Sequence, residues 1–428
     1  MKRGAEMKVI YHTLGCKVNQ YDTEAMRSIL EKAGFETVFD EESADIAVIN
    51  TCTVTNIADR KSRQFIHKNK EKLLCVCGCL AQRDSAGILS IDGVDAVIGT
   101  KNRAQIAAII KRLIDGEQKI DAVGDIMSAR DFEYLELDKS DEKVRANIKI
   151  CEGCNNFCSY CIIPYARGPV RSRDIDDIKA EVGRLADTGI KEFVLTGIHI
   201  GSYGKDKGGG EKLVDVIEAV AAKRGVERVR LGSIEPSTVT EDFTERCSKI
   251  DNLCPHFHLS LQSGSDAVLA RMNRKYDAEE YSAAVKRLRE AFVNPAITTD
   301  IIAGFPGETD REHAETMAFV EEMRFSRIHV FPYSDRNGTR ASKMSGKVPS
   351  DIKKQRAREL IALGQKLENE YLKSFIGHDE NVLFEKTFDE TKLIGHNERY
   401  ITVIGSGNVN EICSVHIEAV SDGKLIGK

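Results

Sequence analysis

The sequence predicts an α/β protein of three units, and three observations predict it. Strand-like runs alternate with helical patterns through residues 7–118, which indicates a parallel α/β domain. Six further strand–helix units within residues 140–370 indicate a partial (β/α)6 barrel. Short strand-like runs separated by turns in residues 374–428 indicate a small antiparallel β-barrel. A chain of 428 residues agrees with two or three domains.

Composition narrows the class of protein. Hydrophobic residues make up 41% and charged residues 30%, no apolar run reaches the length of a membrane span, and residues 1–6 are polar. We therefore expect a cytoplasmic protein with no membrane partner. A net charge of −5 gives no global sign of nucleic-acid binding. Twelve cysteines in such a chain indicate metal binding or catalysis rather than disulfides.

The first unit contains four strand-like segments. They are Val9–Leu14, Asp45–Asn50, Lys72–Val76 and Val94–Ile98. A helical pattern over Asp22–Ala33 follows the first strand, and Gly34 is a plausible end for this helix. In parallel sheets, ligands bind at the carboxyl ends of the strands.

Cys16, Cys52 and Cys79 each follow a different strand of this unit. Strand ends lie at one edge of a parallel sheet, so we expect the three thiols to meet there. The alternative is three unrelated buried cysteines, which is common for this residue. Cys75 and Cys77 lie within or beside a strand, and we expect them to pack in the core.

A basic segment, residues 60–72, follows the Cys52 loop and has helical character. It would ordinarily be a solvated helix face. Because it flanks a candidate reactive site, we expect four of its residues to contact RNA phosphates. They are Arg60, Lys61, Arg63 and Lys68. Residues 119–145 then form an acidic, irregular connector.

Six strands are expected in the central barrel, and chemistry in such barrels lies at their carboxyl ends. They are Ala146–Ile150, Glu192–Leu195, Arg228–Gly232, His256–Leu261, Ile297–Ile302 and Ile328–Phe331. The segments that follow these strands are polar or rich in glycine, which allows a ligand close to the backbone. Residues 351–375 form a linking helix to the third unit, which carries nine acidic and five basic residues. Its charge alone does not indicate RNA binding.

The loop after the first barrel strand has a C-x3-C-x2-C spacing formed by Cys154, Cys158 and Cys161. Thiolates favour iron–sulfur clusters or zinc. Three ligands on a four-iron cluster leave one iron open to another ligand. Two alternatives use Cys151 as a fourth ligand, namely a zinc knuckle and a closed four-cysteine cluster.

Long motifs then carry a family resemblance that covers nearly the whole chain. The first unit contains TLGCKVNQYDTE, NTCTVTN and GCLAQ, which resemble the N-terminal domain of methylthiotransferases. The central unit contains CNNFCSYCIIPYARGPVRSR, LQSGSDAVLARMNR, TDIIAGFPGET and HVFPYSDRNGT, which resemble a radical S-adenosylmethionine (SAM) core. The last unit is similar to the TRAM module, an RNA-binding barrel.

The family has three branches, which act on isopentenyladenosine in tRNA, on an aspartate of a ribosomal protein, or on N6-threonylcarbamoyladenosine in tRNA. The motifs LGCKVNQYDTE and NTCTVTN resemble the third branch in its bacterial form. The first branch typically reads GCQMN and the second GCPKN. The resemblance therefore implies methylthiolation of the adenosine 3′ of the anticodon.

This resemblance implies two 4Fe–4S clusters. Cys154, Cys158 and Cys161 would hold the catalytic cluster that cleaves SAM, and the Cys16–Cys52–Cys79 set would hold an auxiliary cluster that supplies sulfur. An unactivated aromatic C–H is beyond acid–base catalysis, so the cofactors carry the difficult step. A radical derived from SAM would open C2 of the adenine, and a second SAM would supply the methyl group. An electron donor of flavodoxin or ferredoxin type is implied.

Five residues are candidates for contacts with SAM, and the alternative for each is ordinary loop structure. They are Tyr160, Arg173, Gln262, Ser263 and Glu308. Arg167 and Arg171 are candidates for the SAM carboxylate or RNA phosphate. The glycine–glycine–glutamate run usual after the second strand of SAM cores is not obvious here. A rival class is an iron–sulfur electron carrier or sensor with an RNA-binding module.

Overall fold

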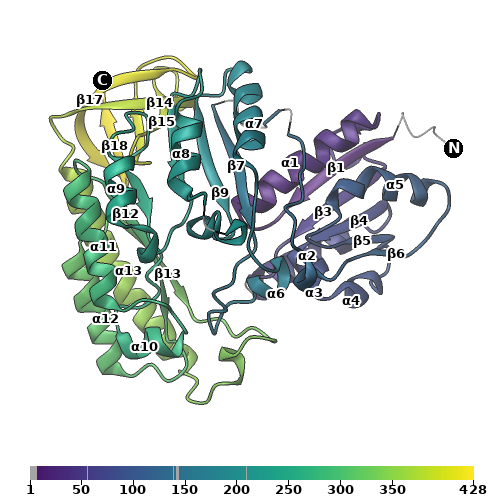
Figure 1. Cartoon of the computed structure of the whole chain (residues 1–428), viewed down its shortest axis with the longest axis horizontal. Coiled ribbons are helices and arrows are strands. Elements are labelled where there is room, and N and C mark those ends of the chain that lie inside the picture. Colours follow the sequence, from purple (N-terminus) through teal and green to yellow (C-terminus); the bar gives the residue numbers. More distant parts are fainter. Residues whose placement is uncertain (1–6, 55, 138, 141–143, 209) are drawn as a thin grey trace.

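The computed structural model describes residues 7–54, 56–137, 139–140, 144–208 and 210–428. The polar segment 1–6 and part of the expected connector lie outside these ranges. The three predicted units follow one another along the chain (Figure 1), and the α/β fold class is confirmed. In that view the first unit forms the right-hand lobe, the central unit lies to its left, and the small barrel lies above the central unit.

The first unit is a six-stranded parallel sheet in the order β2-β1-β3-β4-β5-β6. Its strands are β1 (Lys8–Thr13), β2 (Glu36–Thr37), β3 (Ile46–Thr51), β4 (Leu73–Gly78), β5 (Ala96–Ile98) and β6 (Ile120–Ala122). One face packs against α1 (Lys17–Lys32) and α5 (Ile106–Ile114). The other packs against α2 (Asn56–Lys68), α3 (Cys79–Arg83) and α4 (Ser85–Leu89).

Two expectations for this unit were wrong in detail. The first helix begins at Lys17 rather than Asp22, because Val18 and Tyr21 are already buried on its inner face. The segment taken as the start of an irregular connector adds β6 to the sheet. This strand has three residues, of which Ile120 alone is buried, so it is too short to show a pattern.

The central unit contains the six predicted parallel strands. They are β7 (Arg145–Glu152), β9 (Glu192–Gly197), β10 (Arg228–Leu231), β11 (His256–His258), β12 (Ala296–Ala303) and β13 (Arg327–Pro332). The strands form two sheets, β10-β9-β7-β8 and β11-β12-β13, where β8 (Arg171–Ser172) is antiparallel to β7. Single bridges join the sheets at Val229–Leu253 and Ile234–Leu259, so the strands follow one another around a partial barrel.

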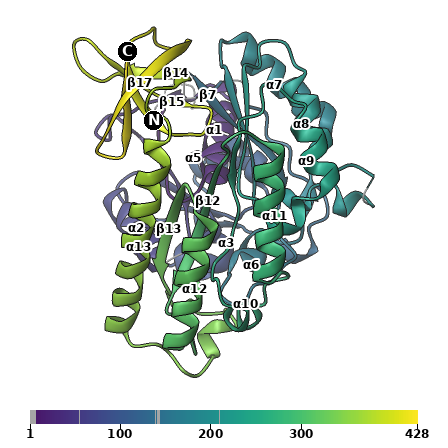
Figure 2. The same ribbon diagram turned by 90° about the vertical axis from the view of Figure 1, so that its left-hand side faces the viewer.

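Helices cover the outside of this barrel. They are α7 (Ile175–Asp187), α8 (Leu213–Ala221), α9 (Glu241–Cys247), α11 (Ala278–Ala291), α12 (Asp310–Met323) and α13 (Ser350–Lys373). Figure 2 shows α11, α12 and α13 side by side, with α13 running into the C-terminal barrel. On the inside, α1 of the first unit packs on β7 and β9. Its Tyr21 and Ala25 belong to the hydrophobic core of the central unit, so the two units share a continuous interior.

The third unit is a closed barrel in the strand order β14-β15-β16-β18-β17. Its strands are β14 (Asp379–Thr387), β15 (Leu393–Asn397), β16 (Thr402–Gly405), β17 (Ile412–Ser421) and β18 (Lys424–Gly427). Arg228 and Arg230 of β10 donate hydrogen bonds to its backbone carbonyls, and Arg145 pairs with Glu385 at 2.9 Å. These buried guanidinium groups fix the barrel on the central unit.

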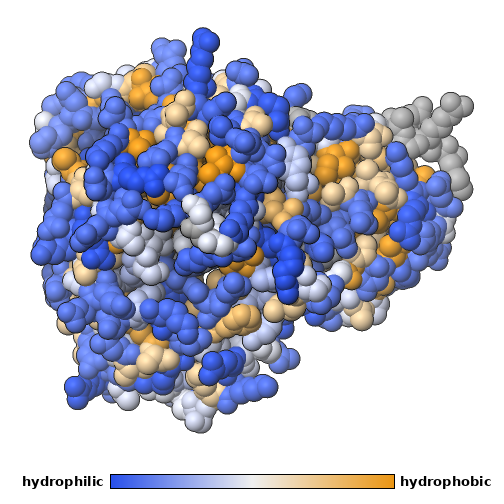
Figure 3. All heavy atoms as spheres, in the orientation of Figure 1, coloured by the Kyte–Doolittle hydropathy of each residue, from blue (hydrophilic) through white to orange (hydrophobic). Residues whose placement is uncertain are grey.

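The face shown in Figure 3 is mostly hydrophilic, with hydrophobic residues in small separate groups. Within the described ranges, no helix combines the length and the apolar character needed to cross a membrane.

Candidate active site

The first group of thiols lies at the carboxyl edge of the N-terminal sheet. Strands β1, β3 and β4 are neighbours, and they lead to Cys16, Cys52 and Cys79 respectively. Gly15 (φ 110°) packs so closely on Cys52 that a Cβ at this position would lie 3.0 Å from its Sγ. Burial raises the pKa of the Cys79 thiol to about 11, and the charges of Cys16 and Cys52 act in the same direction. The sheet therefore places the three cysteines after neighbouring strands, at one edge.

A buried ionic network joins this edge to the central unit. Asp22 of α1 meets Arg103, Lys149 of β7 and Arg167 of α6 (Ile163–Arg167), and Arg167 also pairs with Glu152 at 3.0 Å. All five side chains are almost completely buried. Buried charges are stable only when they are paired and hydrogen-bonded, so this network sets the relative position of the two units.

The second group of thiols lies on the loop between β7 and α6. Gly153 (φ 75°) precedes it, and a Cβ there would lie 1.8 Å from the carbonyl oxygen of Pro169. The backbone N–H of Cys154 donates to Gly168 at 3.0 Å, which closes the loop at its base. Burial raises the pKa of both the Cys154 and the Cys161 thiol, and the charge of Cys158 acts in the same direction. The backbone N–H of Cys161 donates to the carbonyl of Cys158 at 2.9 Å, so these two cysteines share one tight turn.

An arginine that follows α10 (Asp266–Arg271) reaches this loop. Nη1 of Arg274 lies 3.3 Å from Sγ of Cys158 and 3.4 Å from the hydroxyl of Tyr160. Its Nη2 pairs with Glu235 at 2.8 Å, and Glu235 also accepts from Asn156 and meets His199 at 3.0 Å. Burial alone would raise the pKa of Glu235, but the His199 hydrogen bond and the Arg274 charge hold it at about 2.

The donor chemistry fits two clusters with three thiolates each. Cys151 is fully buried within β7, where it pairs with Ser172 and packs against Gly197, so it does not join the loop as a fourth ligand. Among the described residues, no three His, Cys, Asp or Glu side chains are grouped so that they could hold one metal ion. The burial of Cys151 within β7 therefore disfavours the zinc and closed-cluster alternatives that use it as a fourth ligand, and three soft thiolates on each side suit an iron–sulfur cluster.

A cavity of about 300 Å³ opens beside Cys161 at the carboxyl ends of the strands. Tyr160 and Gln262 line it, as do Asp300 and Tyr333. Val54, two residues after Cys52, forms part of its wall, so the cavity also borders the thiol edge of the first unit. Its volume is at the lower end of the range for small-molecule sites.

Three other residues expected near SAM have different surroundings. Arg173 is buried and pairs with Glu181 at 2.9 Å, and its guanidinium lies 4.9 Å from the Tyr134 ring centre. The hydroxyl of Ser263 bonds to Thr316, and Glu308 accepts from Gly304 and pairs with Arg356. None of the three lines the cavity beside Cys161. Their observed contacts hold loops and helices in place.

The four residues expected to contact RNA lie on α2, which confirms the prediction that the basic segment is helical. Arg60 and Lys61 are exposed. Arg63 lies 3.3 Å from Asp84, and Lys68 lies 2.5 Å from Glu41.

Sequence reasoning missed the arginines that connect the two thiol groups to their surroundings. Arg274 ends the motif around Gln262, and Arg336 lies in the segment after β13, where it bonds to Thr53 and pairs with Asp59. Both arginines belong to motifs that resemble the family. A motif does not show, however, which side chain its arginine will contact in the fold.

A partial (β/α)6 barrel with three grouped thiols after its first strand defines a radical SAM protein. Residues 148–320 match the Radical SAM superfamily, and residues 8–99 match the Uncharacterized protein family UPF0004. Among solved structures, the radical S-adenosylmethionine methyltransferase TsrM of Kitasatospora setae shares the fold. It has a TM-score of 0.58 at 14% identity, over 76% of this chain and 72% of that one.

Relatives cover nearly the whole chain. A Bacillus subtilis protein named "Threonylcarbamoyladenosine tRNA methylthiotransferase MtaB" is 42% identical over 94% of this chain and 91% of its own length. The Aquifex aeolicus protein of the same name is 37% identical over 94% and 97%. A "tRNA-2-methylthio-N(6)-dimethylallyladenosine synthase" of Clostridium botulinum is 34% identical over 97% and 95%. The chain belongs to the radical SAM methylthiotransferase family, whose cofactors are SAM and two 4Fe–4S clusters.

Proposed function

We propose that this enzyme converts N6-threonylcarbamoyladenosine, 3′ of the anticodon in tRNA, to its 2-methylthio derivative. The observation that carries the proposal is the pair of thiol groups, one from each α/β unit, on either side of one buried ionic network. The relatives named for this reaction reach 42% identity, and the relatives named for the dimethylallyl substrate 34%. When bound, the clusters and SAM supply radical C–H activation, sulfur and the methyl group.

The residues of the chain have separate roles in this proposal. Cys154, Cys158 and Cys161 hold the catalytic cluster, and the strand-end thiols of the first unit hold the auxiliary one. Tyr160 and Gln262 line the SAM cavity. Arg274 and Arg167 donate hydrogen bonds to one thiol of each group, which positions those thiols and adds positive charge beside them.

Contacts with tRNA are assigned to α2 and the C-terminal barrel. Arg60 and Lys61 are exposed on a helix that follows the Cys52 loop, so they are available to phosphates near the reactive site. The electron donor is of flavodoxin or ferredoxin type, and the enzyme works in the cytoplasm, where tRNA is modified. The donor can be identified by testing which reduced protein supports SAM cleavage.

The test of the function is mass spectrometry of nucleosides from tRNA of a strain without this gene. We expect loss of 2-methylthio-N6-threonylcarbamoyladenosine and its return with the wild-type gene. Cys158→Ala should not restore it, whereas Cys413→Ala, which removes a partly exposed thiol of the C-terminal barrel, should. A change in the isopentenyl nucleoside instead would overturn the substrate assignment. No change in any tRNA nucleoside would overturn the function.

A further inference from the structure

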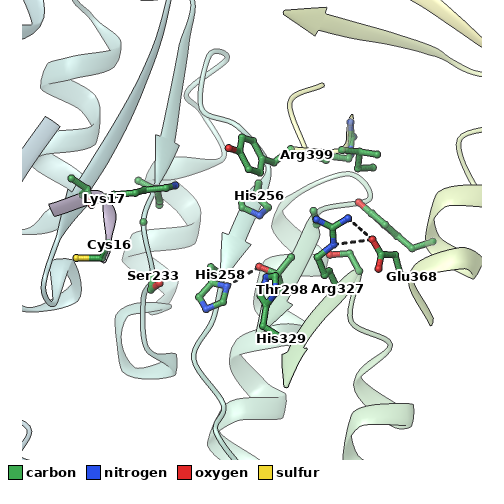
Figure 4. Close-up of a pocket in the computed structure, with 18 of the residues that line it drawn as sticks. Cys16, Lys17, Ser233, His256, His258, Thr298, Arg327, His329, Glu368 and Arg399 are labelled. Atoms are coloured by element: carbon green, nitrogen blue, oxygen red, sulfur yellow. Dashed lines mark hydrogen bonds and ion pairs between the residues drawn. The ribbon is translucent and has the colours of Figure 1, made fainter. Parts of the chain in front are cut away.

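A cavity of about 370 Å³ lies where the three units meet (Figure 4). The start of α1 contributes Cys16 and Lys17, and the C-terminal barrel contributes Arg399 and Tyr400. The central unit supplies most of the remaining wall. Its side chains there include His256, His258 and Arg327, with Glu368 from α13. This cavity is separate from the one beside Cys161.

The cavity borders both reactive regions. Cys16, a ligand of the proposed auxiliary cluster, is part of its wall. His258 lines this cavity and lies 3.3 Å from Asp300, which lines the cavity beside Cys161. If C2 of the target adenine lies between the two reactive regions, the other edges of the purine ring, including N6, must face a neighbouring space. The cavity at the junction of the three units is such a space.

The wall carries more cations than carboxylates. Its cations are Lys17, Arg327 and Arg399, of which Arg327 pairs with Glu368 and Arg399 pairs with Glu380 outside the wall. Nε and Nη2 of Arg327 both donate to Oε1 of Glu368, at 2.8 and 2.5 Å, and Nη1 takes no part in that pair. Figure 4 shows Arg327 and Glu368 together on one side of the cavity, with Lys17 on the other side. An acidic ligand suits this charge balance, and an apolar one does not.

One buried polar atom in the wall also lacks a partner. Nδ1 of His256 is buried and makes no hydrogen bond to any residue in the described ranges. The His256 ring lies 5.7 Å from the ring of Tyr400, which also lines the cavity. Buried polar atoms are nearly always hydrogen-bonded, so an orphaned nitrogen at a cavity wall points to a ligand that bonds to it.

We propose that this cavity receives the acidic N6 substituent of the target adenosine. Arg327 binds the carboxylate, and Nδ1 of His256 hydrogen-bonds to the polar groups of the substituent. This assignment rests on the proposed function and explains its specificity, because an apolar prenyl group would leave the buried Nδ1 of His256 without a partner and would offer no acceptor to Nη1 of Arg327. The site therefore selects an adenosine with a charged, hydrogen-bonding substituent over one with an apolar substituent.

The test compares binding of two anticodon stem-loop RNAs to the cluster-loaded enzyme without reductant, so that no turnover occurs. The RNAs are identical except that one carries threonylcarbamoyladenosine and the other unmodified adenosine. The variants are Arg327→Met and His256→Phe, which retain side-chain bulk, and the control is Arg358→Met. Arg358 is an exposed arginine of α13 outside both cavities.

Wild type and Arg358→Met should prefer the modified RNA by about tenfold or more, the ratio given by one charge-assisted hydrogen bond. Arg327→Met and His256→Phe should each lose most of this preference while binding unmodified RNA as wild type does. If both variants keep the full preference, the cavity assignment is overturned even though the function stands. If wild type methylthiolates an isopentenyladenosine RNA and not the threonylcarbamoyl RNA, the proposed function itself fails.

Discussion

Nε of Arg167 lies 3.1 Å from Sγ of Cys79, although the two residues belong to different units. Arg167 ends α6, which directly follows the loop of Cys154, Cys158 and Cys161. The segment that carries one group of thiols therefore supplies a hydrogen-bond donor to the other. Hydrogen bonds to ligand sulfurs and nearby charge set the reduction potential of iron–sulfur clusters. We expect Arg167 to stabilise the reduced auxiliary cluster.

The first prediction concerns Arg167→Lys, which keeps the positive charge beside Asp22 and Glu152 but removes the donor aimed at Cys79. A hydrogen bond to a charged group contributes about 1.5–3 kcal/mol. Since about 59 mV corresponds to a tenfold change for one electron, loss of the full hydrogen bond from the reduced state alone would lower the potential of the auxiliary cluster by roughly 65–130 mV. A redox titration followed by electron paramagnetic resonance measures this shift.

The matched control is Arg171→Lys. Arg171 is also a buried arginine, but the acceptors found for it within the described ranges are the backbone carbonyls of Arg167 and Pro169 rather than a thiol. Its variant should leave both potentials unchanged. Equal potentials for wild type and Arg167→Lys would show that the contact with Cys79 has no electronic effect.

The second prediction concerns Gly153→Ala. The positive φ of Gly153 and the carbonyl of Pro169, 1.8 Å from the position of an added Cβ, leave no room for a side chain. The loop should shift and lose its cluster, so reconstituted iron should fall from about eight to about four atoms per chain. Gly208→Ala, at another positive φ with open space around it, should keep both clusters. Full iron content in Gly153→Ala would contradict the role of this loop geometry.

The sequence predicted the strands and thiols because both have local signals. All six strands of the central barrel were predicted, since their apolar runs are bounded by turns, and Cys16, Cys52 and Cys79 follow strands that are neighbours in the sheet. The TRAM-like closed barrel was also predicted, although its last strand, β18, was not, because it has only four residues; it pairs with β17 across a tight turn and with β16. A local sequence pattern was therefore sufficient for strands whose own residues carry a clear apolar run.

The surroundings of the arginines could not be predicted in the same way. Arg167 and Arg173 were both candidates for SAM or RNA, yet Arg167 meets Asp22 across 145 residues and Arg173 pairs with Glu181 on α7. The residue type alone does not identify the partner, because a guanidinium group can bind a carboxylate, a phosphate or a thiol. Its partner depends on how the first unit packs on the barrel, which no motif spacing encodes.

The third prediction is a pH dependence due to Glu235. Its folded pKa of about 2 lies below the ordinary value of 4.5, so its ionised form stabilises the fold above about pH 4.5 and this contribution disappears as the pH falls toward 2. Glu235→Gln should therefore lower the free energy of unfolding by about 3 kcal/mol at pH 7, and the difference from wild type should shrink in acid. Urea unfolding of the cluster-free protein from pH 7 to pH 3 measures it. Glu245→Gln, at an exposed site, should match wild type throughout.

The fourth prediction concerns RNA binding by α2. Arg63 and Lys68 already pair with Asp84 and Glu41, whereas Arg60 and Lys61 are exposed, so the latter two should make the stronger phosphate contacts. Each contact releases about one counterion, so Arg60→Gln with Lys61→Gln should weaken tRNA binding at low salt and reduce the slope of log affinity against log salt by about 2. Filter binding at several salt concentrations measures both quantities. Lys366→Gln, which removes an exposed lysine of α13 that pairs with Glu321, should change neither. An unchanged slope in the double variant would show that α2 is a solvated helix face and that tRNA binds elsewhere.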